Sequence, residues 1–137
     1  MQHLIDILHA SACSLVVGKG DDIATYNGRG VSDLYRLLTT EPSALQGACI
    51  ADKVVGKGAA ALMILGGISA LWADVISQAA VDLLADSGIN VQYGRKVPHI
   101  INRQGTGMCP VEHLCADCVT AHECLPLISS FLQNINN

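Results

Sequence analysis

Hydrophobic and polar residues follow one another along the first third of the chain in a pattern that predicts a helix, a hairpin and a second helix. Apolar positions recur at helical spacing over residues 3–12, which predicts a short amphipathic helix. Two short β-like runs follow at residues 14–17 and 23–26, and the glycine- and aspartate-rich segment between them predicts a β-hairpin. A second helix is expected over residues 32–40, with Ser32 as its cap.

The middle third changes to an alternation of strands and helices. Short apolar runs at residues 47–50, 68–75 and 89–93 predict three strands, of which 68–75 is expected to be buried, and helices are expected over 52–65 and 77–86. This order predicts parallel strands joined by crossover helices. Apolar strands without alternation are typical of a sheet that is covered on both faces. The expected fold class is therefore α/β, a three-layer α-β-α sandwich with a five-stranded mixed sheet and an N-terminal antiparallel hairpin.

The last third predicts a loop and then helical segments. Residues 98–109 show no periodic pattern. Pro110 suits the first position of a helix, which places Cys109 at a helix N-terminus. Thr120 and Glu123 have the spacing of a capping box before a final helix that reaches residue 135.

Composition supports one domain over residues 1–137. Half of the residues are hydrophobic and only 15% are charged, where about 25% is usual, so a disordered chain is excluded. The uncharged stretch between Lys57 and Asp74 is interrupted by Gly66-Gly67 and falls short of the ~20 apolar residues that a spanning helix needs, so no membrane span is expected. The first residues lack a leader pattern, which favours a cytoplasmic protein with reduced cysteines. The low charge favours a homodimer or a higher homo-oligomer.

The distribution of charge narrows the class of partner. The formal net charge is -4, and Arg95-Lys96 is the only adjacent pair of basic residues. Binding of a long nucleic acid requires several basic contacts, so this class of partner is excluded. A small anion needs only one or two cations together with backbone N–H groups, and a small anionic ligand agrees with the sequence.

The segment after the third predicted strand is the first candidate site. Asp52 is placed to cap the following helix, and Lys53 and Lys57 are expected one turn apart on one helical face. Gly56 and Gly58 inside a helix each cost about 1 kcal/mol relative to alanine. Such glycines indicate close approach of the backbone either to a ligand or to a neighbouring element. In the second case the lysines are simply solvated.

The loop before Pro110 is the second candidate site. Asn102, Arg103 and Thr106, together with two glycines, offer side-chain and backbone donors to a small polar ligand. Cys109 at a helix N-terminus would have its thiolate favoured by the helix dipole. It is therefore a candidate nucleophile, with His113 as the nearest base in the sequence, and the alternative is a structural cysteine.

Four of the six cysteines crowd into one short stretch and form the third candidate site. They are Cys109, Cys115, Cys118 and Cys124. A Cys-x-x-Cys pair brings two thiolates within reach of one metal, so four thiolates suit Zn or an iron–sulfur cluster. The alternatives are small residues that pack two helices together, or thiols that are free to oxidise.

Two of these segments carry a resemblance to a known family. Ala-Asp-Lys-Val-Val-Gly-Lys at residues 51–57 and Asn-Arg-Gln-Gly-Thr-Gly-Met-Cys-Pro at residues 102–110 resemble a small prokaryotic family of unknown function with a cytidine-deaminase-like fold. The resemblance covers residues 4–135. It implies a five-stranded sheet between helices, and it implies that both motifs meet near the cleft where deaminases bind their base.

The zinc chemistry of the deaminases does not carry over with the resemblance. Those enzymes use a His or Cys two residues before a catalytic Glu, followed by Pro-Cys-x-x-Cys. At the first motif this chain has Ala-Asp-Lys at residues 51–53, and after the next predicted strand it has neither cysteine over residues 75–80. Cys115 and Cys118 lie too late in the chain to replace them.

Three functional hypotheses follow from the sequence. The first is a small anionic or nucleotide-like ligand bound without zinc, with the ligand-binding residues Asp52, Lys53, Lys57, Asn102, Arg103 and Thr106. The second is a thiol-dependent enzyme or transferase, in which Cys109 and Asp52 are the candidate catalytic residues. The third is a metal or iron–sulfur module on the four late cysteines.

Overall fold

A computed structural model describes residues 1–28, 31–102 and 105–136. The helices are α1 (Gln2–Ala10), α2 (Ser32–Thr40), α3 (Lys57–Gly66), α4 (Gln78–Leu84), α5 (Pro110–Cys115) and α6 (Ala121–Asn136), with a 3₁₀ turn over Pro42–Ala44. The strands are β1 (Leu15–Lys19), β2 (Asp22–Tyr26), β3 (Cys49–Val55), β4 (Ala70–Ser77) and β5 (Asn90–Val97). Within these described parts of the chain, no helix has the length and hydropathy that crossing a membrane requires.

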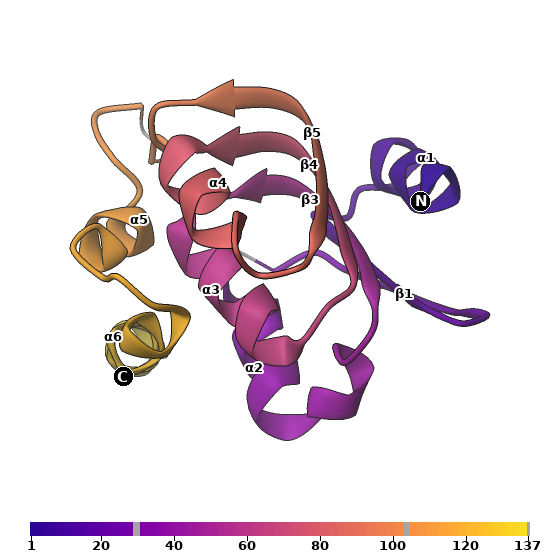
Figure 1. Ribbon diagram of the computed structural model, residues 1–137, viewed down its shortest axis with the longest axis horizontal. Coiled ribbons are helices and arrows are strands. Elements are labelled where there is room, and N and C mark those ends of the chain that lie inside the picture. The colour runs from indigo at the N-terminus through magenta and orange to yellow at the C-terminus, as the bar shows by residue number, and fades with distance from the viewer. Residues whose placement is uncertain (29–30, 103–104, 137) are drawn as a thin grey trace.

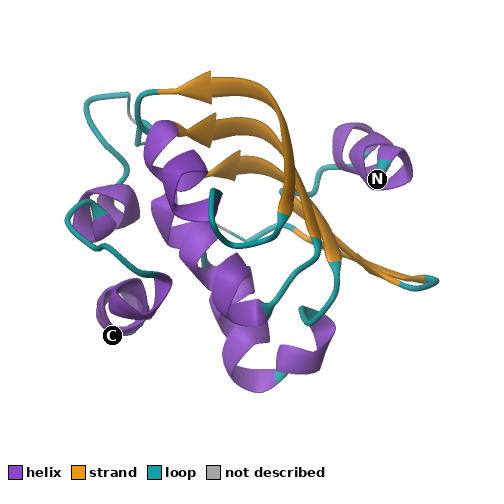
Figure 2. Cartoon of the chain, in the orientation of Figure 1, coloured by secondary structure: helices purple, strands orange, loops and turns teal. Residues whose placement is uncertain are grey.

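The strands form one mixed sheet in the order β2-β1-β3-β4-β5. β1 is antiparallel to both β2 and β3, whereas β3, β4 and β5 are parallel (Figure 2). Helices α3 and α4 connect the parallel strands, because parallel neighbours require a crossover rather than a tight turn. The predicted α/β class, the mixed five-stranded sheet and the N-terminal hairpin are confirmed.

Helices lie on both sides of the sheet but do not cover it evenly (Figure 1). On one face, Leu4 and Leu8 of α1 pack against Val16 and Ala51, which are neighbours in the β1–β3 register. The large core lies on the other face, under α2, α3 and α4, and α5 and α6 pack against α3. β5 stands at the edge with most of its residues exposed. The expectation of a sheet covered on both faces is therefore wrong at β5, because the helices do not extend over this edge of the sheet.

Two of the predicted helix caps are present in the structure. The Ser77 hydroxyl accepts a hydrogen bond from the Ala80 N–H at 3.1 Å and so caps α4. Thr120 and Glu123 form the predicted capping box, with the Glu123 N–H donating to the Thr120 hydroxyl at 3.3 Å and the Thr120 N–H donating to the Glu123 carboxylate at 3.1 Å. Ser32 is not the N-cap of α2, because that position belongs to Val31 and the helix begins at Ser32 itself.

The boundary between β3 and α3 differs most from the prediction. The predicted helix over residues 52–65 begins five residues too early, since β3 continues to Val55 and Gly56 is the N-cap of α3. Asp52 and Val54 pair in register with Ala73 and Val75 of β4. The two polar residues that follow the apolar run, Asp52 and Lys53, therefore belong to the strand. β3 is extended to Val55 because it pairs with β1 on one side and β4 on the other. A pattern of neighbouring residues in the sequence does not show these pairings.

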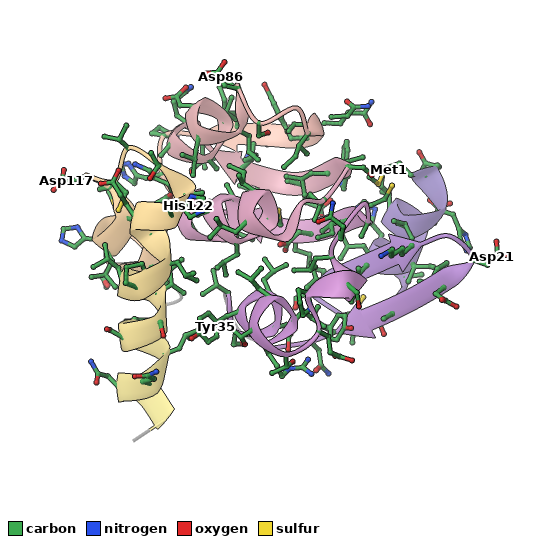
Figure 3. The ribbon with its side chains drawn as sticks, turned by 60° about the horizontal axis from the view of Figure 1, so that its bottom comes forward. Met1, Asp21, Tyr35, Asp86, Asp117 and His122 are labelled. Atoms are coloured by element: carbon green, nitrogen blue, oxygen red, sulfur yellow. The ribbon has the colours of Figure 1, made fainter. Side chains whose placement is uncertain are left out.

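The last helix is tied to the first half of the chain. Tyr35 of α2 lies beside α6, and its hydroxyl oxygen is 2.7 Å from the Ser129 hydroxyl oxygen (Figure 3). Ile128 of α6 is fully buried in the main core. These contacts hold α6, and α5 with it, against α2 and α3, and the start of α3 lies at the carboxyl end of β3 beside the candidate site.

Candidate functional site

A cavity of about 480 Å³ lies beside the start of α3, at the end of the sheet where β3, β4 and β5 terminate. Its described walls include Val54, Gly56 and Phe131, together with residues 100–102 and 109–112. Open α/β sheets bind ligands beyond the carboxyl ends of their strands. The volume also falls in the ~300–1,000 Å³ range of small-molecule sites. Residues from both sequence motifs therefore line one pocket.

A second, larger hollow of about 910 Å³ lies between the β1–β2 hairpin and the segment that follows α2. It is a more open depression, and none of the predicted site residues lines it. It is also remote from the carboxyl ends of the parallel strands. We therefore take the smaller cavity as the candidate functional site.

Glu112 is the central polar residue of this pocket. It lies in the first turn of α5, and only 3% of its surface is exposed. Its Oε1 atom accepts hydrogen bonds from the Lys57 N–H at 2.9 Å and from the Ser77 hydroxyl at 2.6 Å. Its Oε2 atom accepts a hydrogen bond from the Ile100 N–H. One carboxylate thus joins the start of α3, the cap of α4 and the loop that follows β5.

Two glycines allow α5 to approach the start of α3. A Cβ atom on Gly58 would lie 2.3 Å from Val111 Cγ1, which is far inside van der Waals contact. A Cβ atom on Gly56 would lie 3.2 Å from Glu112 Oε1 and from Ile100 Cγ1. Of the two reasons for glycine that the sequence left open, the structure shows close approach to a neighbouring element.

Lys57 stabilises the end of α5 and does not line the cavity. Its side chain is buried, and its Nζ atom donates hydrogen bonds to the carbonyl oxygens of Ala116 (3.1 Å) and Cys118. Carbonyl groups at a helix C-terminus lack partners within the helix and carry partial negative charge, so an ammonium group is favourable there. Lys57 therefore contributes its backbone N–H to the pocket network through Glu112 and its side chain to packing.

Comparison with known proteins places the chain in a family. Residues 3–132 match the family model for a domain of unknown function, DUF1893. The chain belongs to the DUF1893 family. The crystal structure of a DUF1893 family protein, TM1506 from Thermotoga maritima, is similar to it with a TM-score of 0.86 and 26% sequence identity. The similarity covers 94% of this chain and 87% of that one. No curated protein matches the chain.

In this DUF1893 chain Asp52 lies in β3 and does not cap a helix, contrary to the prediction. It pairs with Leu15 and Ala73, is 8% exposed, and its Oδ1 atom accepts a hydrogen bond from the Val54 N–H at 3.3 Å. Burial raises the pKa of its carboxyl group to about 7, and the negative charge of Asp74 adds to the rise, whereas backbone hydrogen bonds oppose it. Asp52 is not among the described residues that line the pocket.

The lysine pair expected on one helical face is also split. Lys53 lies in β3, between Asp52 and Val54, whereas Lys57 is the first residue of α3. Successive side chains of a strand leave opposite faces of the sheet. Because Val54 lines the pocket, the side chain of the preceding residue, Lys53, projects from the opposite face of the sheet, away from the pocket. The predicted one-turn spacing is therefore wrong.

The loop before α5 brings one predicted ligand-binding residue to the pocket. Asn102 lines the cavity, and its side chain is bonded to Thr106, with the Thr106 N–H donating to Oδ1 at 3.0 Å and Nδ2 donating to the Thr106 hydroxyl at 3.1 Å. Thr106 therefore shapes the loop that carries Asn102. Arg103 lies outside the described residues. The residues predicted from the sequence do not include Glu112 and Phe131, although a lone charge after Cys-Pro-Val is a signal for Glu112.

The late cysteines of the DUF1893 chain divide between the pocket and the core. Cys109 is half-buried, lines the pocket and is the N-cap of α5, as predicted. Cys115 and Cys124 are fully buried beside Cys118 in the main core. Burial raises the pKa of both buried thiols, which disfavours the thiolate that a metal ligand must supply. Among the residues that the structure describes, no three His, Cys, Asp or Glu side chains are arranged to hold a metal ion.

Proposed function

We propose that this DUF1893 protein binds a small, nucleotide-like molecule whose flat ring enters the pocket beside α3 and α5. The observation that carries the proposal is the meeting of both sequence motifs in one cavity at the carboxyl ends of the parallel strands. The described walls are mainly apolar, with Val54, Ile100 and Phe131 facing the same space as a few polar groups. Apolar walls with a few placed polar groups are typical of sites for small organic ligands.

The same proposal includes a cytidine-deaminase-like fold without zinc deaminase chemistry. The strand order β2-β1-β3-β4-β5, with parallel β3, β4 and β5, agrees with the fold that the resemblance implies. The residues at the start of α3 are Gly56, Lys57 and Gly58, and Ser77 precedes α4. Neither segment contains the His, Cys and Glu set that a zinc deaminase needs to activate water.

The charges around the pocket favour a ring in its interior over a phosphate group. The Lys57 ammonium group is occupied by two carbonyl oxygens of the α5 terminus. No lysine, arginine or histidine is found among the lining residues that the structure describes. An anionic part of the ligand would therefore lie outside the cavity, where solvent screens its charge.

Filling the cavity from its rim tests the proposal. Val54 lines the pocket and is 47% exposed, so Val54→Trp is expected to occupy the cavity and to weaken binding of adenosine and cytidine at least tenfold without unfolding the protein. The measurement is isothermal titration calorimetry, with the thermal midpoint as a check on folding. Val119→Trp is the matched control, because Val119 is 79% exposed and does not line the pocket. Unchanged affinity in Val54→Trp, or no binding by the wild type, refutes the proposal.

The position of Cys109 favours one alternative, a thiol-dependent enzyme or transferase. Cys109 is the one cysteine among the described pocket residues, and its thiol stands at the N-terminus of α5. At pH 7, iodoacetamide is expected to label Cys109 at least tenfold faster than Cys118, which is also half-buried but outside the pocket. Peptide mass spectrometry over a time course measures both rates. Equal rates for the two cysteines count against the thiol alternative.

A further inference from the structure

We infer that the inner wall of the pocket selects ligands whose ring donates a hydrogen bond, and that Glu112 is the acceptor that makes this selection. The inference rests on the proposed function, because it concerns the ligand of the same pocket. It names the ligand class more narrowly, as a flat ring with an N–H or amino group on its buried edge. Rings that present only acceptors at that edge are rejected.

The hydrogen bonds of Glu112 leave it able to accept one more. A carboxylate has about four lone-pair sites on its two oxygens. Oε1 already accepts from the Lys57 N–H and the Ser77 hydroxyl, whereas the Ile100 N–H is the only donor to Oε2 among the described residues. Glu112 is among the residues that line the cavity, so a donor on the ligand would take the remaining site on Oε2.

The same bonds hold the acceptor in a fixed place. The three donors come from the start of α3, the cap of α4 and the loop after β5, and these segments are anchored by the strands that precede them. Glu112 itself is 3% exposed, so water does not compete freely for its oxygens. A fixed, buried acceptor discriminates between ligands, because a ligand without a matching donor leaves a buried lone pair without a hydrogen bond.

The polar groups beside Glu112 in the described pocket are already partly engaged. One N–H of the Asn102 amide donates to the Thr106 hydroxyl, and its Oδ1 atom accepts from the Thr106 N–H. The Cys109 N–H donates to the Ile100 carbonyl oxygen at 2.8 Å, so this backbone donor is also used. With no described cation in the lining, an anionic group on the ligand would face the Glu112 carboxylate without a positively charged side chain to balance it.

A pair of ligands with the same shape tests the inference on the wild-type protein. Indole and benzofuran are fused rings of nearly equal size that differ in one position, an N–H donor in the first and an oxygen acceptor in the second. Indole is expected to bind at least tenfold more tightly in ligand-observed NMR titrations. The carboxyl ¹³C signal of Glu112 in labelled protein is expected to shift with indole and to remain in place with benzofuran.

Two variants separate the possible outcomes. Glu112→Gln, checked for folding by its thermal midpoint, is expected to lose the preference for indole, and Val54→Trp is expected to weaken binding of both rings. Equal binding of the two rings, with both lost in Val54→Trp, overturns the inference and leaves the proposed function in place. A preference for indole that persists in a folded Glu112→Gln variant also overturns the inference. Binding of indole to the wild type without a shift of the Glu112 signal overturns it as well. No binding of either ring overturns the inference, whereas the proposed function is decided separately by the nucleoside titrations.

Discussion

Glu112→Ala is expected to lower the free energy of unfolding by about 4 kcal/mol, a large share of the ~5–15 kcal/mol that holds a typical domain together. The substitution removes the acceptor of three donors, those of Lys57, Ser77 and Ile100, at a position that is 3% exposed. Each buried donor without a partner costs about 1–3 kcal/mol. Partial relaxation of the pocket keeps the total below the simple sum. Urea unfolding followed by circular dichroism measures the change.

Glu123→Ala is the matched control for this prediction. The Glu123 carboxylate also accepts three hydrogen bonds, from the N–H groups of Val119 and Thr120 and from the Thr120 hydroxyl, but it lies on the surface. Water replaces a lost acceptor there, so the expected loss is about 1 kcal/mol, as for other helix caps. If both variants lose the same stability, the buried network around Glu112 does not have the role described above.

Asp52→Asn is expected to stabilise the protein relative to the wild type at pH 8, and to do so much less at pH 5. Burial raises the pKa of Asp52 from 3.8 to about 7. Between these values the folded state binds a proton that the unfolded state has released, so the stability of the wild type falls as the pH rises and then levels off above about pH 7. Each pKa unit corresponds to about 1.4 kcal/mol, so the difference between variant and wild type is expected to grow by about 3 kcal/mol from pH 5 to pH 8.

Urea unfolding of both proteins across this pH range measures the effect of Asp52. Asp21→Asn serves as the control, because Asp21 lies exposed at the tip of the β1–β2 hairpin (Figure 3). Its stability is expected to follow that of the wild type at every pH. A constant difference between Asp52→Asn and the wild type from pH 5 to pH 8 would show that Asp52 does not titrate in this window.

Features of the fold that depend on neighbouring residues in the sequence could be predicted. The hairpin, the Ser77 cap and the Thr120–Glu123 capping box depend on contacts over a few residues, and the structure confirms them. The start of α3 depends on pairing of β3 with strands on both sides, and so the prediction failed at Asp52 and Lys53. The exposed position of β5 depends on sheet order, which local patterns do not specify.

In the candidate site, too, features that depend on neighbouring residues could be predicted, whereas contacts between distant residues could not. The sequence places Cys109 at the start of a helix and Asn102 in a loop with donors, and both line the pocket. It does not show that Glu112 meets partners 55, 35 and 12 residues away in the chain. It also does not show that Lys53 and Lys57, two of the predicted cations, lie in different elements, β3 and α3, and leave them in different directions. The metal site and the oligomeric state stay predictions.

The position of Glu112 late in the chain has a consequence for synthesis on the ribosome. The starts of α3 and α4 emerge first, and the carboxylate that joins them emerges only after 55 and 35 further residues, respectively. Contacts that close long loops form late in folding, because the conformational entropy lost on closing the loop must be overcome before the contact contributes stability. The nascent chain can therefore build its sheet while the pocket end stays open, and the pocket closes as one of the last steps. A ligand present in the cell during translation would meet that end of the sheet before α5 docks.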